Sequence, residues 1–506
     1  MFLALGPNIK AYPYFWPSMH ADETVIEITV DFSPNDLRSF AQNVSDVQAL
    51  LVSSDILQAD EEFLQQVLPD DRLAWYASLL AQTALLFQRK AGHRVSFCSV
   101  SSSSDPGRCQ AYLEYDHLDV GITAVKLAYE LVSGKRKSLA EPFYRFREFA
   151  RSRALPAVTG AIINAALRRN IPYLQLERYP LKRDSFKDIT GDVCICLNGL
   201  LMLGHGVHQH VVDGTFCHDK SKALLGMLED SDQRRDLLIN LGIPLIQPDD
   251  KGMVNAGEYQ LIVVNGQITG VVSGSDGTLN SVDDLHPSLF DTMISINREV
   301  GFAPVVIKLL STDITVPMNE SGGGVLDFSL APDLDQLTTH VAGGNSSLLD
   351  STADALLDWL FPEKTKARMP VIAVTGTNGK TTTSRLIYHV MREAGYKPGL
   401  VCTDGISLNG EQIASGDQCQ DTGHLKVLTS KKVDAAVLET HHRGLKYRGL
   451  AFRWCDIAVC LNVTDDHLGK LNIDTVEQMA EVKAVLPRHA RQAAISGHCG
   501  FCSQPG

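Results

Sequence analysis

Alternating apolar and polar positions in the N-terminal part predict a small mixed domain. Residues 24–32 (TVIEITVDF) and 110–115 have the patterns of half-buried strands. Residues 71–91 and 122–131 instead carry apolar side chains at helical spacing. We therefore predict a small α+β domain over residues 1–155.

Helix and strand patterns alternate from Thr159 onward. The strongest local signal is Asn265-Gly266, a dipeptide that favours a tight turn between the two strands of a hairpin. Residues 340–350, rich in Gly and Ser, have the composition of a linker. These patterns predict a second domain with a nucleotide-type sheet over residues 156–350.

The most informative stretch is residues 371–385, VIAVTGTNGKTTTSR. Its β-branched start predicts a buried strand, its glycines predict a turn, and residues 384–391 have the pattern of an amphipathic helix. Three further strand patterns follow, at residues 400–404, 435–439 and 457–462. We predict a parallel sheet in a third domain over residues 351–506, and hence a multidomain α/β protein.

A glycine loop between a strand and a helix is the geometry of a phosphate-binding site, because its N–H groups and the helix N-terminus attract anions. Lys380 is placed to contact the outer phosphates, and Thr381 is placed to bind Mg²⁺ through its hydroxyl. The loop differs from the common GxxxxGK[ST] form, because Val374 stands where the first glycine belongs. The predicted ligands are ATP and Mg²⁺. The predicted loop residues are Thr375, Gly376, Thr377, Asn378, Gly379, Lys380, Thr381 and Thr382.

Polar residues follow two of the predicted strands. Glu439 ends one, and Asp465, Asp466 and His467 come directly after another. Ligands bind at the carboxyl edge of an open α/β sheet, so these side chains are candidates for a magnesium shell beside the phosphate loop. Each taken alone is more often a surface residue or a helix cap.

Composition and charge narrow the class of protein. The chain has 506 residues, a net charge of −13 and no apolar run of about 20 residues. The negative charge argues against a general nucleic-acid binder, and the first residues lack the pattern of a secretion signal. The eleven cysteines are scattered and several lie in apolar runs, which is typical of reduced, buried thiols. We predict a cytoplasmic protein without membrane or nucleic-acid partners.

Two other groups have metal-like spacing. The segment HGVHQH contains His205, His208 and His210, which we interpret as exposed loop histidines because no carboxylate or cysteine accompanies them in sequence. Cys499 and Cys502 have the spacing of a zinc half-site, but no second pair is evident and the tail 488–506 lacks periodicity. We interpret this tail as disordered.

These motifs together resemble one family, the cyanophycin synthetases. The similar segments include GIPLIQP, ADALLDWLFP, VIAVTGTNGKTTTSRLI, TDGISLNGE, AAVLET, NVTDDHLG and DTVEQMAEVKAV. The resemblance implies an N-terminal domain, an ATP-grasp domain that here lacks its middle, and a Mur-ligase-like domain. It implies an ATP-dependent acid–amino-acid ligase that activates a carboxylate as an acyl phosphate. Aspartate, arginine or β-aspartyl-arginine are the implied substrates.

The resemblance also assigns roles in the Mur-like part. Lys380 and Thr381 correspond to the phosphate and magnesium contacts, and Glu439 and His467 to a second magnesium shell. Lys483 falls where such ligases carry a carbamylated lysine that orients a metal, and Asn462 belongs, with Asp466, to an NxxxDH signature at the nucleotide. The implied catalytic residues are Lys380, Lys483 and His467.

Several positions depart from the family pattern. In the ATP-grasp-like part, Lys308 stands where an acidic metal ligand is expected, and Asp327-Phe328-Ser329 replaces a Glu-x-Asn pair. In the Mur-like part, a pattern like ETARGGILR appears as ETHHRGLKY, and a GD-x-TGP-type loop appears as GDQCQDTG. A C-terminal lid of the usual length is also missing from these 506 residues.

Three hypotheses follow. The chain is an active ligase, alone or completed by a partner chain. Alternatively, it is a nucleotide-binding pseudoenzyme that regulates or scaffolds an active synthetase, as a homo-oligomer or as a hetero-oligomer with a full-length synthetase. A decayed or frame-shifted gene product is the third.

Overall fold

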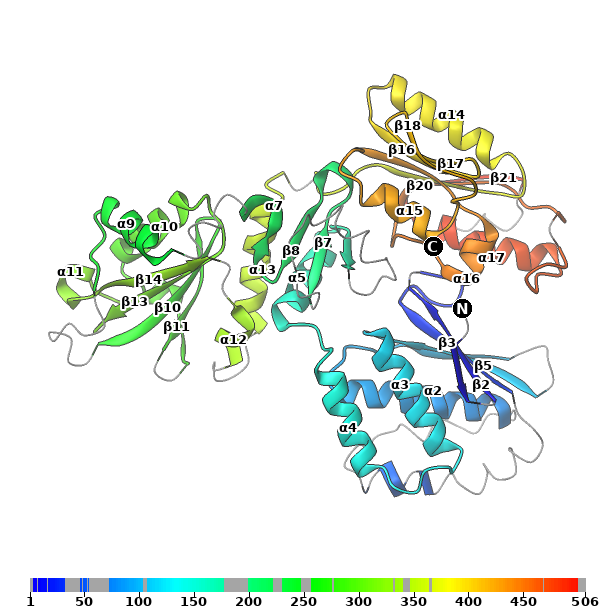
Figure 1. The fold of residues 1–506 in the computed structure, drawn as a ribbon, viewed down its shortest axis with the longest axis horizontal. Coiled ribbons are helices and arrows are strands. Elements are labelled where there is room, and N and C mark those ends of the chain that lie inside the picture. Colours follow the sequence, from blue (N-terminus) through cyan, green and yellow to red (C-terminus); the bar gives the residue numbers. More distant parts are fainter. Residues whose placement is uncertain are drawn as a thin grey trace. The chain divides into compact units, whose positions relative to one another are not determined.

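In the part of the chain that the computed structural model describes, strands form four sheets with flanking helices (Figure 1). The chain divides into two compact units, Met1–Ala154 with Pro370–Leu428 and Lys432–Gly506, and Leu155–Met369 with Thr429–Lys431. The structure describes residues 3–6, 8–15, 17–31, 46–47, 49–51, 53, 72–102, 107–176, 199–221, 230–246, 256–274, 277–330, 333–339, 346–363, 366–466 and 468–498.

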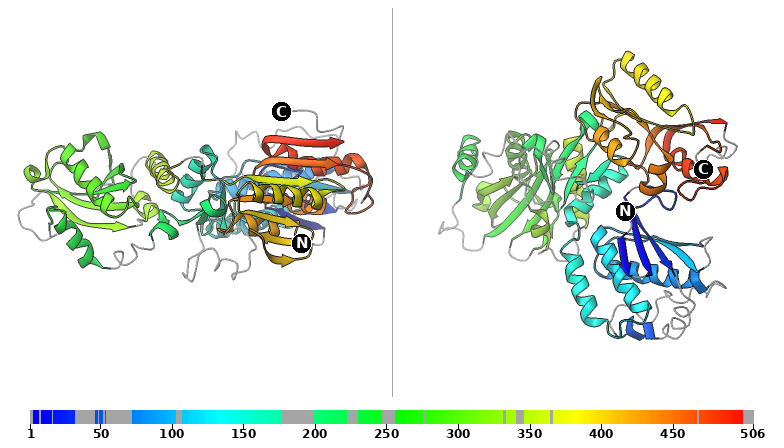
Figure 2. Two further views of the ribbon diagram at one scale, coloured as in Figure 1. Left: turned by 90° about the horizontal axis from the view of Figure 1, so that it is seen from above. Right: turned by 45° about the vertical axis from the view of Figure 1, so that its right-hand side comes forward.

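The N-terminal part contains an antiparallel sheet in the order β1-β2-β3-β5-β4. Helices α2 and α3 cover one face of this sheet and enclose a core with it (Figures 1 and 2). The predicted strands and helices are therefore confirmed here. The elements are β1 (Leu3–Gly6), β2 (Ile9–Tyr14), β3 (Val25–Asp31), α2 (Arg72–Lys90), β4 (Cys98–Ser102), β5 (Arg108–Glu114), α3 (Leu118–Val132) and α4 (Ala140–Arg151).

The second unit has two antiparallel sheets, β12-β11-β10-β13-β14 and β6-β7-β8-β9. The predicted hairpin is β10–β11, and its turn residues Asn265 and Gly266 have φ angles of 52° and 72°, as a tight hairpin turn requires. The elements of the larger sheet are α9 (Ser231–Asn240), β10 (Gly257–Val264), β11 (Gln267–Ser273), β12 (Leu279–Asn280), η5 (Val282–Asp284), α10 (Pro287–Glu299), β13 (Val305–Ser311), α11 (Met318–Ser321) and β14 (Gly324–Leu330). The strands of the smaller sheet are β6 (Tyr173–Gln175), β7 (Leu200–Leu203), β8 (His210–Asp213) and β9 (Phe216–Cys217). The helices of the same part of the unit are α5 (Ala157–Arg168), η3 (Gly206–His208), α7 (His218–Ser221), α12 (Leu334–Thr339) and α13 (Ser346–Leu360).

Helix α13 begins inside the segment predicted to be a linker. Its residues Leu348, Leu356 and Leu357 are buried in a core shared with α5, and the Thr352 hydroxyl lies 2.8 Å from that of Thr269. Because this apolar face needs a partner, the helix belongs to the second unit, which therefore extends past the predicted boundary at residue 350.

The histidines of HGVHQH are not exposed, contrary to the prediction. His205, His208 and His210 are all partly buried at the edge of the small sheet. The backbone N–H of His205 donates to Ala367 O at 3.2 Å, and burial lowers the pKa of the His205 imidazole to about 4. These residues are therefore only partly exposed to water.

The C-terminal part contains a seven-stranded sheet in the order β18-β17-β16-β19-β15-β20-β21. The five strands from β16 to β21 in this order are parallel, as predicted, and β17 and β18 add an antiparallel edge. Helix α14 lies on one face, and α15, α16 and α17 lie on the other (Figure 1). The elements are β15 (Val371–Thr375), α14 (Lys380–Glu393), β16 (Pro398–Cys402), β17 (Gly405–Leu408), β18 (Glu411–Ser415), α15 (Asp421–Leu428), β19 (Ala435–Glu439), α16 (His442–Arg448), β20 (Cys455–Asn462), α17 (Val476–Arg488) and β21 (Ala490–His498).

The tail is only partly as predicted. Residues Ala490–His498 form β21, which pairs in parallel with β20 from Cys455 to Asn462. The prediction of disorder over the whole tail was therefore wrong for these residues, because hydrogen bonding to a distant strand supplies order that local periodicity does not reveal. Cys499 and Cys502 lie outside the described residues.

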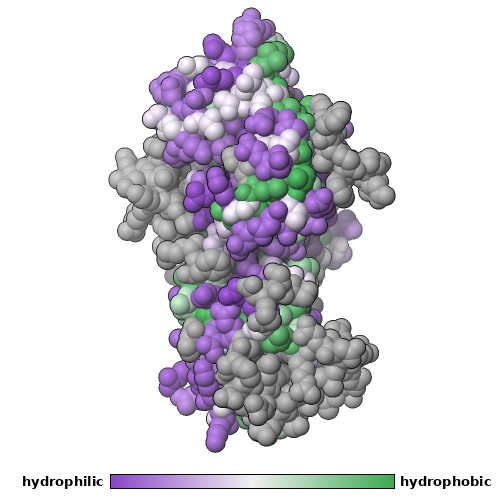
Figure 3. Space-filling model, turned by 90° about the vertical axis from the view of Figure 1, so that its right-hand side faces the viewer, coloured by the Kyte–Doolittle hydropathy of each residue, from purple (hydrophilic) through white to green (hydrophobic). Residues whose placement is uncertain are grey.

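Cysteines and surface residues complete the description. Cys455 and Cys460 are buried and take part in no disulfide bond among the described residues, as predicted, whereas Cys194 and Cys196 lie outside the described residues. Every helix in the described part of the chain is too short or too polar to cross a bilayer. Hydrophilic residues cover much of the face drawn in Figure 3, with smaller hydrophobic groups between them.

Candidate nucleotide-binding site

The glycine loop lies between the fully buried strand β15 and helix α14, as predicted. Gly379 precedes the helix with φ 83°, a left-handed conformation that suits glycine. Gly376 has φ 150°, and a Cβ there would lie 3.0 Å from Leu461 Cβ. Both glycines are therefore required by the backbone path, and the N-terminus of α14 is left next to the loop.

Asn462, at the end of β20, holds this loop in place. Its side-chain Oδ1 accepts hydrogen bonds from the N–H groups of Thr377 and Asn378 at 3.1 and 2.9 Å. Its Nδ2 donates to Asn378 O at 3.2 Å, and its backbone O accepts from Thr377 N at 2.9 Å. The predicted nucleotide residue Asn462 therefore contacts the loop itself, and its direct contact with a nucleotide stays a prediction.

Two lysines converge on Thr377. Lys380 Nζ donates to Thr377 O at 2.7 Å, and the Nζ of Lys483, which is 2% exposed, donates to Thr377 Oγ1 at 3.2 Å. The N–H of Thr464 donates to the same hydroxyl at 3.1 Å. The structure thus brings Lys380 and Lys483 to the same loop residue, although the two lysines are 103 positions apart in the sequence.

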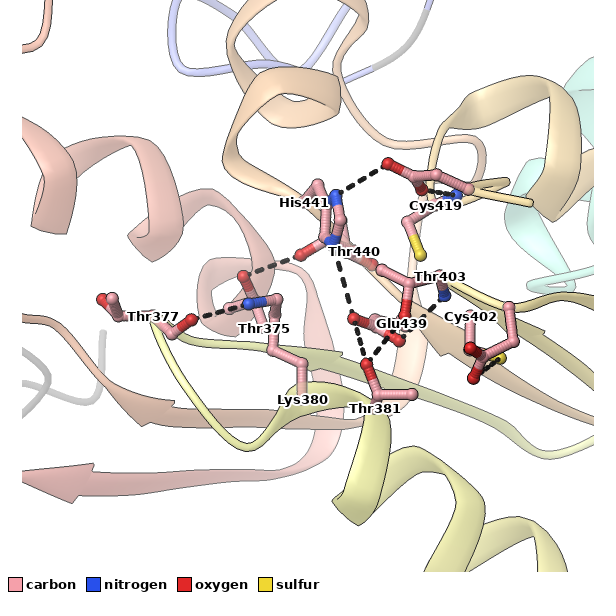
Figure 4. A network of polar contacts seen from close by, with 12 residues as sticks. Thr375, Thr377, Lys380, Thr381, Cys402, Thr403, Cys419, Glu439, Thr440 and His441 are labelled. Atoms are coloured by element: carbon pink, nitrogen blue, oxygen red, sulfur yellow. Dashed lines mark hydrogen bonds and ion pairs between the residues drawn. The ribbon is translucent and has the colours of Figure 1, made fainter. Parts of the chain in front are cut away.

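Glu439, the last residue of β19, is fully buried beside the first turn of α14. Thr381 Oγ1 donates to Glu439 Oε1 at 3.1 Å and lies 3.0 Å from Thr403 Oγ1. The N–H of Thr403 donates to Glu439 Oε2 at 3.3 Å, and His441 Nε2 lies 3.3 Å from Oε1 (Figure 4). The predicted pair of Thr381 and Glu439 is therefore in direct contact.

The donor set of this cluster suits a small hard cation. A buried carboxylate and two hydroxyl oxygens face one another, and Mg²⁺ prefers oxygen ligands. Thr381 and Glu439 are the residues that would hold Mg²⁺. The third predicted ligand, His467, lies outside the described residues, and Asp465 and Asp466 are exposed.

The remaining predicted loop residues have different environments. The hydroxyl of Thr375 is buried and donates to Thr440 O at 3.0 Å, so its side chain is used inside the domain. Thr382 is exposed in the first turn of α14. Only the backbone of Thr375 therefore remains a candidate for a nucleotide contact.

Sequence reasoning missed three neighbours of Glu439. Thr403 follows β16, and His441 follows β19 by two residues, so both lie at the strand-end edge that pointed to Glu439. His424, on α15, lies with its Nε2 2.8 Å from Glu439 O, and burial lowers the pKa of its imidazole. A search of every strand end, not only of motif residues, finds the first two.

A family model and several known proteins match the part of the chain that holds these residues. The Mur ligase middle domain family matches residues 374–496, which hold the loop, Glu439 and Lys483. The UDP-N-acetylmuramoyl-L-alanyl-D-glutamate–2,6-diaminopimelate ligase of Bacillus cereus is 32% identical over 135 residues, covering 26% of this chain and 27% of that protein. A solved structure of a ligase of the same name is 28% identical, covers 28% of this chain and 30% of that one, and has a TM-score of 0.22.

The cyanophycin synthetase of Synechocystis sp. is 39% identical over 208 residues, covering 41% of this chain and 23% of that protein. That of Crocosphaera subtropica is 33% identical over 265 residues, covering 52% of this chain and 28% of that protein. The chain thus spans about a quarter of the length of these relatives. Over about half of its length the chain is similar to cyanophycin synthetases, and residues 374–496 match the Mur ligase middle domain family.

Proposed function

We propose that the part of the first unit formed by Pro370–Leu428 and Lys432–Gly506 binds the phosphates of ATP together with Mg²⁺ and serves an ATP-dependent acid–amino-acid ligase of the cyanophycin synthetase type. The observation that carries the proposal is the contact at 3.1 Å between Thr381 Oγ1 and the buried carboxylate of Glu439, directly behind a glycine loop. A hydroxyl and a carboxylate at the N-terminus of a helix form an arrangement suited to a phosphate-bound magnesium ion.

The residues of this chain would act by position and charge. Lys380 is 2.7 Å from Thr377 O and is free to turn from that carbonyl to the outer phosphates of a nucleotide. The loop N–H groups and the N-terminus of α14 favour negative charge at the same place. Bound Mg²⁺ would supply further positive charge to the transferred phosphoryl group.

The proposed reaction transfers the terminal phosphoryl group of ATP to a substrate carboxylate, releasing ADP. An amine then attacks the carbonyl carbon of the acyl phosphate, so that an amide forms and inorganic phosphate leaves. Aspartate, arginine and β-aspartyl-arginine are the substrates that the resemblance favours. Lys483 is proposed to act on the loop through Thr377, since its ammonium already contacts that hydroxyl.

Phosphate release by the purified full chain tests this proposal. The assay contains ATP and Mg²⁺, with or without aspartate, arginine or β-aspartyl-arginine. We expect release that requires an amino-acid substrate, disappears in Lys380→Ala and persists in Lys432→Ala, a matched variant of an exposed lysine paired with Glu411. Release that ignores amino acids, or that survives in Lys380→Ala, contradicts the proposal.

A second candidate function, that of a nucleotide-binding pseudoenzyme, is favoured by one observation in the other unit. Lys308 lies opposite Asp327 in the β13–β14 ladder. Both carboxylate oxygens of Asp327 accept hydrogen bonds at 3.0 Å from Arg234. At the positions where the resemblance implies metal ligands, a lysine and a neutralised carboxylate therefore oppose cation binding.

This second candidate makes a different prediction in solution. A pseudoenzyme binds ATP without amino-acid-dependent phosphate release, and its addition changes the activity of a full-length synthetase with which it assembles. Mixing the two purified proteins and measuring synthetase activity distinguishes the candidates. A mixture whose activity equals the sum of the separate proteins argues against the regulatory role.

A further inference from the structure

Three side chains with metal-binding atoms meet beside Glu439. The carboxylate of Asp417, the thiol of Cys419 and the imidazole of His441 place one ligand atom each within 4.8 Å of one another. His441 Nδ1 lies 3.4 Å from Asp417 Oδ2. Among the described residues, this is the group of His, Cys, Asp and Glu side chains that has the spacing of a metal site.

The backbone holds these residues together. The N–H of His441 donates to Cys419 O at 3.5 Å, and the N–H of Cys419 donates to Asp417 Oδ1 at 3.0 Å. Helix α16 packs closely on the same loop, because a Cβ on Gly444 would lie 3.3 Å from Cys419 O. The three side chains therefore come from two segments that are fixed to each other.

The separations suit a tetrahedral ion. Metal bonds of about 2.0 to 2.3 Å place the ligand atoms of a zinc site roughly 3.3 to 3.8 Å apart. The 3.4 Å between His441 Nδ1 and Asp417 Oδ2 lies in this range, and 4.8 Å bounds the distances to the Cys419 sulfur. A displacement of the Cys419 sulfur by about 1 Å would bring it within the separation expected of two ligands of one zinc ion.

Glu439 orients the imidazole. Its buried Oε1 lies 3.3 Å from His441 Nε2, and the other ring nitrogen, Nδ1, lies 3.4 Å from Asp417 Oδ2. A carboxylate that accepts the second ring N–H of a ligating histidine is the usual outer partner in zinc sites. This buried carboxylate is an observation independent of the three ligands themselves.

The three side chains differ in how far they are exposed to solvent. Cys419 is fully buried, the His441 side chain is 22% exposed and the Asp417 side chain is 51% exposed. An ion can therefore enter from the Asp417 side, and water can occupy a fourth position. The mixed sulfur, nitrogen and oxygen donors favour a borderline transition metal over Mg²⁺ or Ca²⁺.

The geometry points to a Zn²⁺-type site formed by Asp417, Cys419 and His441, with Glu439 as the residue that positions His441. On binding, the Cys419 thiol loses its proton to solvent and a metal–sulfur bond forms, without any change in oxidation state. The site lies in the two segments, GDQCQDTG and ETHHRGLKY, that depart from the cyanophycin synthetase pattern. It requires no nucleotide. It shares Glu439 with the proposed magnesium site, whereas Asp417 and Cys419 belong to this site alone, so Cys419→Ser tests it separately from the proposed function.

Titration with Co²⁺ as a spectroscopic probe tests this site. The full chain is used with Cys499→Ser and Cys502→Ser, so that the tail thiols cannot contribute. We expect a thiolate-to-Co²⁺ charge-transfer band that saturates at equimolar Co²⁺ and is lost on adding Zn²⁺. Cys419→Ser should remove this band, and Glu439→Gln should weaken Zn²⁺ binding about 10- to 100-fold.

Matched variants make the result decisive. Cys455→Ser removes another buried thiol of the same domain, and His389→Ala removes an exposed imidazole on α14; both should leave Co²⁺ binding unchanged. Thermal unfolding in a chelator checks that all variants are folded. The absence of a charge-transfer band in the parent chain, or a band of equal intensity in Cys419→Ser, overturns the assignment and leaves His441 as a polar neighbour of the Asp417 and Glu439 carboxylates.

Discussion

Asn462 supports the phosphate loop through hydrogen bonds that the substitution Asn462→Ala would remove. The side-chain amide makes three of them, accepting from Thr377 N and Asn378 N and donating to Asn378 O. Each such bond contributes about 0.5 to 1.5 kcal/mol net, so the sum is roughly 1.5 to 4.5 kcal/mol. Because Asn462 is partly exposed, water replaces some of this, and we expect about 1.5 to 3 kcal/mol.

That free energy should be lost from nucleotide binding, because the loop must then be ordered by the ligand. We expect the dissociation constant of Mg²⁺–ATP, measured by calorimetry, to rise about 10- to 150-fold. Gln412→Ala is the control, since that amide also makes two hydrogen bonds to backbone oxygens but lies on β18, away from the loop. Equal Mg²⁺–ATP affinities of Asn462→Ala and the parent chain would refute the reasoning.

Three further predictions concern Glu439, Thr377 and His20. Glu439→Gln removes the charge of the proposed magnesium ligand, so it should weaken Mg²⁺-dependent ATP binding by at least about tenfold and leave Mg²⁺-free binding unchanged. Calorimetry in Mg²⁺ or in a chelator measures the two affinities, and an unchanged magnesium dependence contradicts the metal assignment. Thr377→Ala removes an acceptor of the buried Lys483 ammonium and should lower the free energy of unfolding, measured in urea, by about 1 to 3 kcal/mol. Thr377→Ser keeps the hydroxyl and should leave this free energy unchanged. Equal losses of stability in both variants would show that the hydroxyl is unimportant. His20 stacks on Tyr112 with ring centroids 4.1 Å apart, and burial lowers the pKa of its imidazole to about 4. As the pH falls from about 6.5 toward 4, the unfolded state binds the proton first, so stability is lost in that window. His20→Phe should therefore reduce the difference in urea stability between pH 7 and pH 5 by about 2 kcal/mol, and an unchanged difference argues against the buried neutral imidazole.

The sequence was sufficient where chemistry and local pattern coincide. Residues 371–391 show this, because all of their predicted features are local ones that the structure confirms. These features are the apolar strand, the two glycines with positive φ angles and the amphipathic helix. Glu439 was found because the carboxyl ends of parallel strands share one edge. The sheet order placed its carboxylate against Thr381, which lies 58 residues earlier.

Features that depend on distant pairing were not predictable in the same way. Strand β21 is ordered by hydrogen bonds to β20, and α13 starts early because its apolar face meets α5. The meeting of Cys419 with His441 depends on a backbone hydrogen bond between two loops. In each case the decisive partner is remote in sequence, so no local pattern contains the information.

The binding of Mg²⁺–ATP to the purified full chain tests the central claim most directly. Calorimetry should show saturable binding that requires Mg²⁺, and the affinity should fall sharply in Lys380→Ala and remain unchanged in Lys432→Ala. Failure of the parent chain to bind Mg²⁺–ATP, or equal affinity in Lys380→Ala, would contradict the account of the loop as a phosphate-binding site.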